Sequence, residues 1–177
     1  MKKQQFLSTL MLLACLWVGS GNLYAQTEAQ PKWVPLEMAN LQLNFTDKWK
    51  IEMQEHFGIH ATSPDGKVQF FAYVTDDHSI DDAVKSMQKD LDKYMDNVKL
   101  SNAEVTFEGN GLKVYSSGGT GDSTTEGGQP SRFIIDFIET HTDEHIIVAF
   151  LAIGTDAEIE ANATDLYYIF NSVKENH

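Results

Sequence analysis

The sequence has few of the residues that form crosslinks or carry common catalytic motifs. Its 177 residues include one cysteine, Cys15, and one arginine, Arg132. A single cysteine cannot form a disulfide within the chain, so the core alone must hold the fold. The sequence also lacks a Gly-x-Ser-x-Gly elbow and a His-Glu-x-x-His pattern. These absences argue against the common serine hydrolases and zinc proteases.

Basic residues are scarce throughout. Lysine and arginine number 13 against 26 aspartate and glutamate residues, and the formal net charge is −13. Nucleic acids bind basic surfaces, so we expect no nucleic-acid partner. Anionic membrane surfaces are disfavoured for the same reason. The charge favours solubility, and it is compatible with a basic protein partner or with divalent cations.

Residues 1–25 have the pattern of a secretory signal peptide. Lys2 and Lys3 precede an apolar run over residues 6–18, and Ala25 offers a small residue for cleavage before residue 26. The run is shorter than a membrane span needs, so we expect no integral span in the mature chain and a periplasmic or secreted protein. As an alternative, the tetrapeptide Leu-Leu-Ala-Cys that ends at Cys15 resembles a bacterial lipobox. A lipid anchor there would hold the chain on the envelope.

The remaining sequence predicts one α+β domain over residues 41–177, preceded by an extended leader over residues 26–40. Alternating apolar residues predict strands near 41–45, 49–53, 57–63, 67–74, 104–108 and 112–116. Helical spacing predicts a helix over 80–98, capped by Ser79, and a second helix after a capping box at Thr155 and Glu158. We expect an antiparallel sheet sandwiched between these two amphipathic helices.

The densest apolar stretch, residues 132–154, predicts a β-hairpin with its turn at 142–144. Both faces of this hairpin are apolar, which is typical of the middle of a sheet covered on both sides. The expected register pairs Glu139 with Ile147 and His141 with His145. The two histidines could share a divalent metal, with Glu139 or Asp143 as an oxygen ligand. The alternative is that these polar residues end two strands at an exposed turn.

A segment without apolar residues, 118–131, precedes this hairpin. We expect a flexible loop there that could lie over a binding site, and no lysine follows its glycines as in a phosphate-binding loop. The glycines of the expected loop are Gly118, Gly119, Gly121, Gly127 and Gly128.

Asp136 and a group of acidic residues at the start of the first helix are further candidates for a functional site. Asp136 falls on a largely apolar face of the predicted hairpin, near Phe150, so it needs a partner if it is buried. Arg132, Tyr167 or Tyr168 could provide one. The acidic residues at 76, 77, 81 and 82 could bind calcium, but the position of negative charge at a helix start explains them better.

The segment Leu43-Asn44-Phe45-Thr46-Asp47-Lys48-Trp49 resembles the opening of a PsbP-like domain, a strand followed by a short turn and a tryptophan. The resemblance covers residues 41–174, mostly through the order of elements. It implies an α-β-α sandwich and a non-catalytic role in binding a partner. Thr46 and Asp47 replace the proline that often precedes the tryptophan in that family, and no functional residue carries over. A cystatin-like α+β fold is the structural alternative.

These observations rank three functions. The first is a non-catalytic accessory protein of the bacterial envelope that binds a protein partner. The second is a small-ligand or divalent-metal-binding module that uses the turn with His141 and His145. The third is a hydrolase with an unrecognised site. We expect no enzyme activity and no cofactor other than a possible divalent metal.

Overall fold

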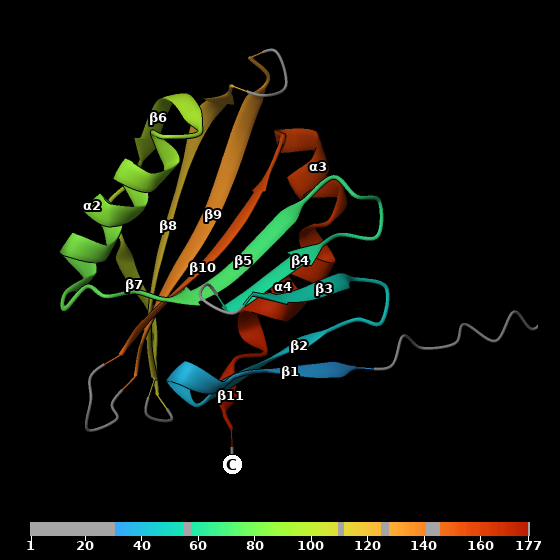
Figure 1. Cartoon of the computed structure of the whole chain (residues 1–177), viewed down its shortest axis with the longest axis vertical. Helices are drawn as coiled ribbons and strands as arrows, with labels where there is room; N and C mark the ends of the chain where they lie inside the picture. Colours follow the sequence, from blue (N-terminus) through green and yellow to red (C-terminus); the bar gives the residue numbers. More distant parts are fainter. Residues whose placement is uncertain (1–30, 55–57, 110–111, 125–127, 141–145, 177) are drawn as a thin grey trace, which may run out of the picture.

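The structure is a computed structural model that describes residues 31–54, 58–109, 112–124, 128–140 and 146–176 (Figure 1). Its main sheet is antiparallel, in the order β3-β4-β5-β10-β9-β8-β6, and β7 also pairs with β8. The strands of this sheet are β3 (Lys50–Gln54), β4 (Gly58–Thr62), β5 (Gln69–Val74), β6 (Met95–Leu100), β7 (Glu104–Gly109), β8 (Leu112–Ser123), β9 (Pro130–Thr140) and β10 (Ile147–Gly154).

The predicted central hairpin is formed by β9 and β10, which lie in the middle of the main sheet. Glu139 pairs with Ile147, and Asp136 pairs with Phe150. This is the predicted register over the whole described length of the two strands. Alternating side chains therefore reach opposite faces as expected, because the period of a strand is two.

Helices cover both faces of the main sheet. Helix α2 (Ile80–Leu91) lies on one face, whereas α3 (Asp156–Ala161) and α4 (Ala163–Asn171) lie on the other (Figure 1). The face under α2 carries a buried cluster that includes Met87, Phe133, Ile135, Phe137 and Ala149. The face under α4 carries a second cluster that includes Phe70, Ile138, Phe150, Leu166 and Phe170. The predicted α-β-α sandwich is therefore confirmed.

The aromatic residues of the second cluster hold α4 on the sheet. The ring of Phe70 lies 5.5 Å from the ring of Phe170 and 5.9 Å from that of Phe150, measured between centroids. Such tilted and edge-on pairs stabilise a core beyond the area that they bury. The helical spacing after Thr155 also predicts Ala163 and Tyr167 on the buried side of the helix, but both are exposed.

Residues 32–39 of the expected leader form a strand and a short helix that pack in the domain. Strand β1 (Lys32–Leu36) and the short helix η1 (Glu37–Ala39) precede β2 (Leu41–Phe45). A small sheet in the order β1-β2-β11 is completed by β11 (Lys174–Glu175). Val34, Leu36 and Ala39 are buried and add apolar surface to the cluster under α4.

The first predicted helix is too long. Helix α2 starts after Ser79, whose hydroxyl accepts a hydrogen bond from the backbone N–H of Asp82, as predicted. It ends at Leu91, and the residues expected as its last turns form β6. Met95 and Val98 still pack against the cluster under α2, together with Leu100, so these apolar residues are partly buried from a strand.

The glycine-rich segment is also different from the prediction. Gly118, Gly119 and Gly121 lie within β8 and not in a flexible loop. Gly128, with φ of +80°, lies in the connection to β9, and Gly127 lies outside the described residues. A Cβ on Gly119 would lie 2.2 Å from the carbonyl oxygen of Lys99. Glycine is therefore required for β6 to pair closely with this half of β8.

Candidate functional site

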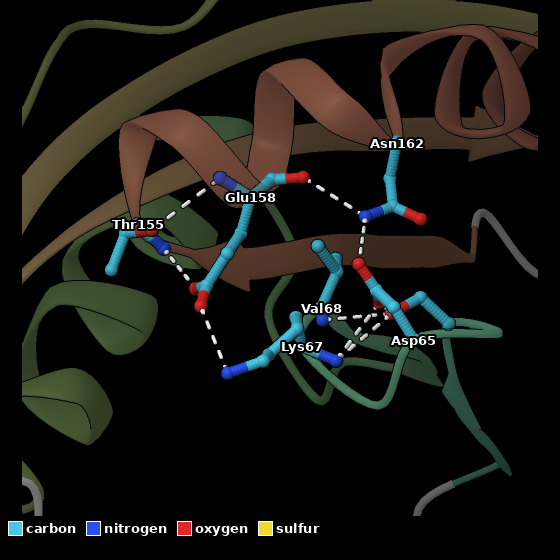
Figure 2. A network of polar contacts seen from close by, with 7 residues as sticks. Asp65, Lys67, Val68, Thr155, Glu158 and Asn162 are labelled. Atoms are coloured by element: carbon cyan, nitrogen blue, oxygen red, sulfur yellow. Dashed lines mark hydrogen bonds and ion pairs between the residues drawn. The ribbon is translucent and has the colours of Figure 1, made fainter.

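Two polar clusters on the α4 side of the molecule are candidates for a site. The first, here called the turn network, joins the β4–β5 turn to the start of α4 (Figure 2). The Ser63 hydroxyl accepts hydrogen bonds from the backbone N–H groups of Lys67 and Val68, and it donates one to Asp65. The side-chain amide of Asn162 donates to Asp65 over 3.1 Å and to the carbonyl of Glu158 over 3.0 Å.

The local sequence explains the turn network. The sequence Ser63-Pro64-Asp65-Gly66 predicts a tight turn, in which Gly66 has φ of +74° and its N–H donates to the carbonyl of Ser63. Thr155 and Glu158 form the predicted capping box at the start of α3. Lys67 lies 3.8 Å from Glu158, which adds an ion pair between the turn and the helix.

The groups of the turn network bind one another, so the network has a structural role. The hydrogen bond from Ser63 lowers the pKa of Asp65 most, and the hydrogen bonds from the N–H of Lys67 and the amide of Asn162 lower it further.

Asn162 is 9% exposed, and Asn44 is 4% exposed. Both asparagines begin an Asn-x-Thr glycosylation sequon. Because their side chains are buried, neither is accessible for glycosylation in the folded chain.

The second cluster, here called the polar row, crosses three neighbouring strands. The hydroxyls of Thr106 on β7 and Ser116 on β8 lie 2.9 Å apart, and Ser116 donates to the Asp136 carboxylate on β9 over 2.6 Å. Because a hydroxyl has one proton, Ser116 must accept from Thr106 when it donates to Asp136. The row therefore runs in one direction and ends on a carboxylate.

The polar row forms part of a groove of about 750 Å³ between β7 and the C-terminal end of α4. The sides of the groove are apolar or aromatic at Phe107, Leu112, Val114, Phe170 and Val173, and Asn171, Lys174 and Glu175 complete the lining. A second hollow of about 460 Å³ shares Thr106 and Ser116 with the groove. It adds Ser101, Asn102, Glu104 and Ser117.

A β-bulge directs Phe107 into the groove. Val105 pairs with Tyr115 and Phe107 pairs with Val114, so Thr106 is an extra residue on β7. Without the bulge, Val105 and Phe107 would share one face, because the strand period is two. The bulge places the two side chains on opposite faces. They are 52% and 49% exposed respectively.

Asp136 is the half-buried carboxylate at the end of the polar row. Its burial raises the pKa of the carboxyl group, and the hydrogen bond from Ser116 opposes that rise. Among the residues that the structure describes, Ser116 is its one hydrogen-bond partner. The predicted partners are wrong: Arg132 lies 3.7 Å from Asp156, and Tyr167 and Tyr168 are exposed.

Lys174 of β11, which lines the groove, and Lys113 of β8 each lie over an aromatic ring. The amine of Lys174 is 3.7 Å from the centre of the Trp33 ring, and the amine of Lys113 is 5.1 Å from that of Tyr115. Cations are attracted to the face of such rings. Neither lysine forms a salt bridge with Asp136 in the described part of the chain.

One residue of the predicted metal site, Glu139, lies within the described residues. Glu139 accepts a hydrogen bond from the hydroxyl of Tyr115 over 2.8 Å. His141, Asp143 and His145 lie outside the described residues, so the metal hypothesis stays a prediction. Within the described ranges, no group of three or more His, Cys, Asp and Glu residues is arranged to hold a metal ion.

The acidic residues before α2 are explained by the helix start. Asp82 binds the Ser79 hydroxyl and Lys85, and Asp77 accepts a hydrogen bond from Ser86. These contacts, and the favourable position of negative charge at the first turn of a helix, account for the cluster. In the part of the chain that is described, no helix is long and apolar enough to cross a membrane.

No protein-family model and no curated protein matches the chain. Solved structures are similar in fold. Cyanobacterial PsbP (CyanoP) from Synechocystis matches with a TM-score of 0.61 and 11% identity, over 88% of this chain and 98% of that one. LpqN, involved in cell envelope biogenesis of Mycobacterium tuberculosis, matches with a TM-score of 0.57 and 12% identity, over 82% and 90%.

The Ran-binding protein Mog1p of Saccharomyces cerevisiae matches with a TM-score of 0.50 and 7% identity, over 84% of this chain and 96% of that one. Identities this low show a shared fold and no more. The chain therefore has the PsbP-like fold that the opening strand and the element order predicted. Its groove has to be interpreted from its own residues.

Proposed function

We propose that the chain is a non-catalytic accessory protein of the bacterial envelope that acts by binding a protein partner. The expected signal peptide supports export to the periplasm or beyond, and a lipid anchor at Cys15 is the alternative. Among proteins with this fold, one is involved in cell envelope biogenesis and another binds Ran. Both roles are compatible with a binding protein.

The observation that carries this proposal is the exposure of β7. Residues 104–108 are exposed on both faces of the strand. In the described chain β7 pairs with β8 alone, so its outer edge offers unpaired backbone groups. Phe107 adds exposed aromatic surface beside the groove, and Val105 adds exposed apolar surface on the opposite face of β7. An aromatic residue at such a position is typical of a protein-binding surface.

The chemistry of the groove favours binding over catalysis. The polar row consists of Thr106, Ser116 and Asp136 and includes no histidine. A serine nucleophile needs an adjacent base to activate it. We therefore rank a hydrolase last among the three functions.

Affinity capture tests the binding proposal. The full chain is the bait for a solubilised envelope extract, and it is compared with Phe107→Asp and with Tyr167→Asp. Tyr167 is a matched control because it is 73% exposed on α4 and does not line the groove. We expect a partner that the wild type and Tyr167→Asp retain and Phe107→Asp loses. Equal retention by all three would contradict this surface, and no retained protein would contradict a protein partner.

A divalent-metal module that uses His141, His145, Glu139 and Asp143 is the second candidate. The register of β9 and β10 supports it, because that register is the predicted one as far as Glu139 and Ile147. Native mass spectrometry before and after addition of zinc tests it. A stoichiometric zinc adduct that His141→Ala abolishes would support the metal module. The absence of an adduct would contradict it.

A further inference from the structure

We propose that the groove beside β7 receives a lysine or arginine side chain from an extended segment of the partner protein, with the carboxylate of Asp136 as its counter-charge. The inference rests on the proposed function, because it names the chemistry of the partner at the same surface. Three properties of the groove support it: its apolar lining, its polar row and its charge.

The walls fit the long apolar stem of a cationic side chain. The apolar lining combines Phe107 of β7, Val114 of β8 and Phe170 of α4. Lysine and arginine bury their methylene groups against such surfaces while the charged head reaches a polar partner. Aromatic rings next to the stem also attract the cation.

The polar row in the lining of the groove fits the charged head. Asp136 has one donor, Ser116, among the described residues, so its carboxylate can accept further hydrogen bonds. Its environment is apolar enough to raise the pKa of the carboxyl group. A cation placed there would interact strongly, because ion pairs are weakly screened away from water. It would also stabilise the ionised form that burial disfavours.

The charges around the groove favour a cation over an anion. Glu175 lines the groove and Glu104 lines the adjoining hollow. Lys174 is the basic residue in the lining, and its amine lies over the Trp33 ring. The chain as a whole carries a net charge of −13, which increases the rate of encounter with a basic partner.

The surroundings favour a polypeptide over a small amine. The adjoining hollow is lined by hydroxyl groups of Ser101, Ser117, Thr106 and Ser116, which can bind the backbone of an extended segment. The groove volume of about 750 Å³ exceeds the space that one lysine side chain needs. The exposed edge of β7 lies next to both hollows and extends the surface.

Peptide titrations followed by NMR on the full chain test the inference. The probe is the pentapeptide acetyl-Gly-Ser-Lys-Ser-Gly-amide, and the matched control replaces its lysine with norleucine, which keeps the stem and removes the charge. We expect the lysine peptide to bind about tenfold more tightly and to shift signals of Phe107, Ser116 and Phe170. Equal binding of the two peptides would overturn the inference.

Two variants identify the counter-charge. Asp136→Asn keeps the shape of the side chain and an acceptor for Ser116, and we expect it to weaken the lysine peptide by about tenfold. Asp81→Asn removes the same charge from α2, on the other face of the sheet, and should leave the affinity unchanged. Equal affinities of wild type and Asp136→Asn would overturn the assignment of Asp136.

A second measurement does not depend on the folding of a variant. In the wild type, the pH midpoint of the Asp136 carboxyl carbon should move to lower pH when the lysine peptide binds, because a cation favours the ionised form. The norleucine peptide should leave it in place, and the same midpoint with both peptides would overturn the inference. If Asp136→Asn still captures the partner that Phe107→Asp loses, the inference fails while the proposed function stands.

Discussion

The turn network and the polar row contain the same kinds of group, and they differ in whether those groups are satisfied. In the turn network, Ser63, the backbone N–H of Lys67 and Asn162 all donate to Asp65. In the polar row, Ser116 alone donates to Asp136 among the described residues. The pKa of Asp65 is lowered and that of Asp136 is raised. A saturated cluster stabilises the fold, whereas an unsaturated one can bind something else.

The difference follows from what each cluster joins. The turn network closes the β4–β5 turn against α3 and α4, since the Asp65–Asn162 hydrogen bond and the Lys67–Glu158 ion pair join the turn to the helices (Figure 2). The polar row lies within three neighbouring strands that the sheet already holds together by backbone pairing. Its side chains are therefore not needed to join elements, and they face the groove.

The largest expected difference is in the loss of unfolding free energy caused by two serine substitutions, one in each cluster. Ser63→Ala removes the acceptor for the N–H groups of Lys67 and Val68, and Val68 is fully buried. We expect it to lower the free energy of unfolding by about 1–3 kcal/mol, the cost of an unsatisfied buried group. Ser116→Ala removes a hydroxyl that faces the groove, and it should lower the free energy of unfolding by less. Urea denaturation measures this free energy for both variants. Equal losses, or a larger loss for Ser116→Ala, would contradict the distinction between a structural and a binding cluster.

A smaller effect is expected from the link between the turn and the helix. Asp65→Ala and Asn162→Ala remove the two ends of one hydrogen bond, so a double-mutant cycle should give a coupling energy of about 0.5 kcal/mol. The value is low because Asp65 is exposed to water. Asn171→Ala on the same helix is the control partner, since its amide binds the carbonyl of Tyr167. Equal coupling in the two cycles would show that the Asp65–Asn162 contact adds nothing specific.

The smallest effect, and the one with opposite signs in the two clusters, is the pH dependence of stability. The raised pKa of Asp136 means that the folded state binds its proton more tightly, so protonation stabilises the fold. The stability of the wild type relative to Asp136→Asn should therefore rise as the pH falls through the raised pKa. For Asp65 the pKa is lowered, and the stability relative to Asp65→Asn should fall as the pH falls through the unfolded value. Urea denaturation between neutral and acidic pH measures both signs, and the same sign for both carboxylates would contradict the comparison.

Features set by neighbouring residues could be predicted from the sequence. The caps at Ser79 and Thr155 and the turn with Gly66 depend on side chains within a few residues of one another. The register of β9 and β10 follows from the position of their turn and from alternation on both strands. The helix on each face of the sheet follows from the apolar stripes and from the two apolar faces of this hairpin.

Features set by distant residues could not be predicted. Met95 and Val98 continue the helical spacing of α2, and their place in β6 depends on the contact between Lys99 and Gly119. The groove combines a bulge at Thr106 with the end of α4 and with β11, which lie more than sixty residues later in the chain. Asp136 was recognisable as a polar residue on an apolar face. Ser116 and Thr106 had no such pattern, because serine and threonine are common in strands and turns.

Photo-crosslinking in living cells tests most directly the claim that the polar row is the binding site and the turn network is structural. A photoreactive residue replaces Phe107 in the groove or Lys67 beside the turn network, and Lys67 is the control because its side chain is 61% exposed. The account predicts a crosslinked partner from position 107 and none from position 67. Equal crosslinking from both positions, crosslinking from 67 alone, or none from 107 would contradict it.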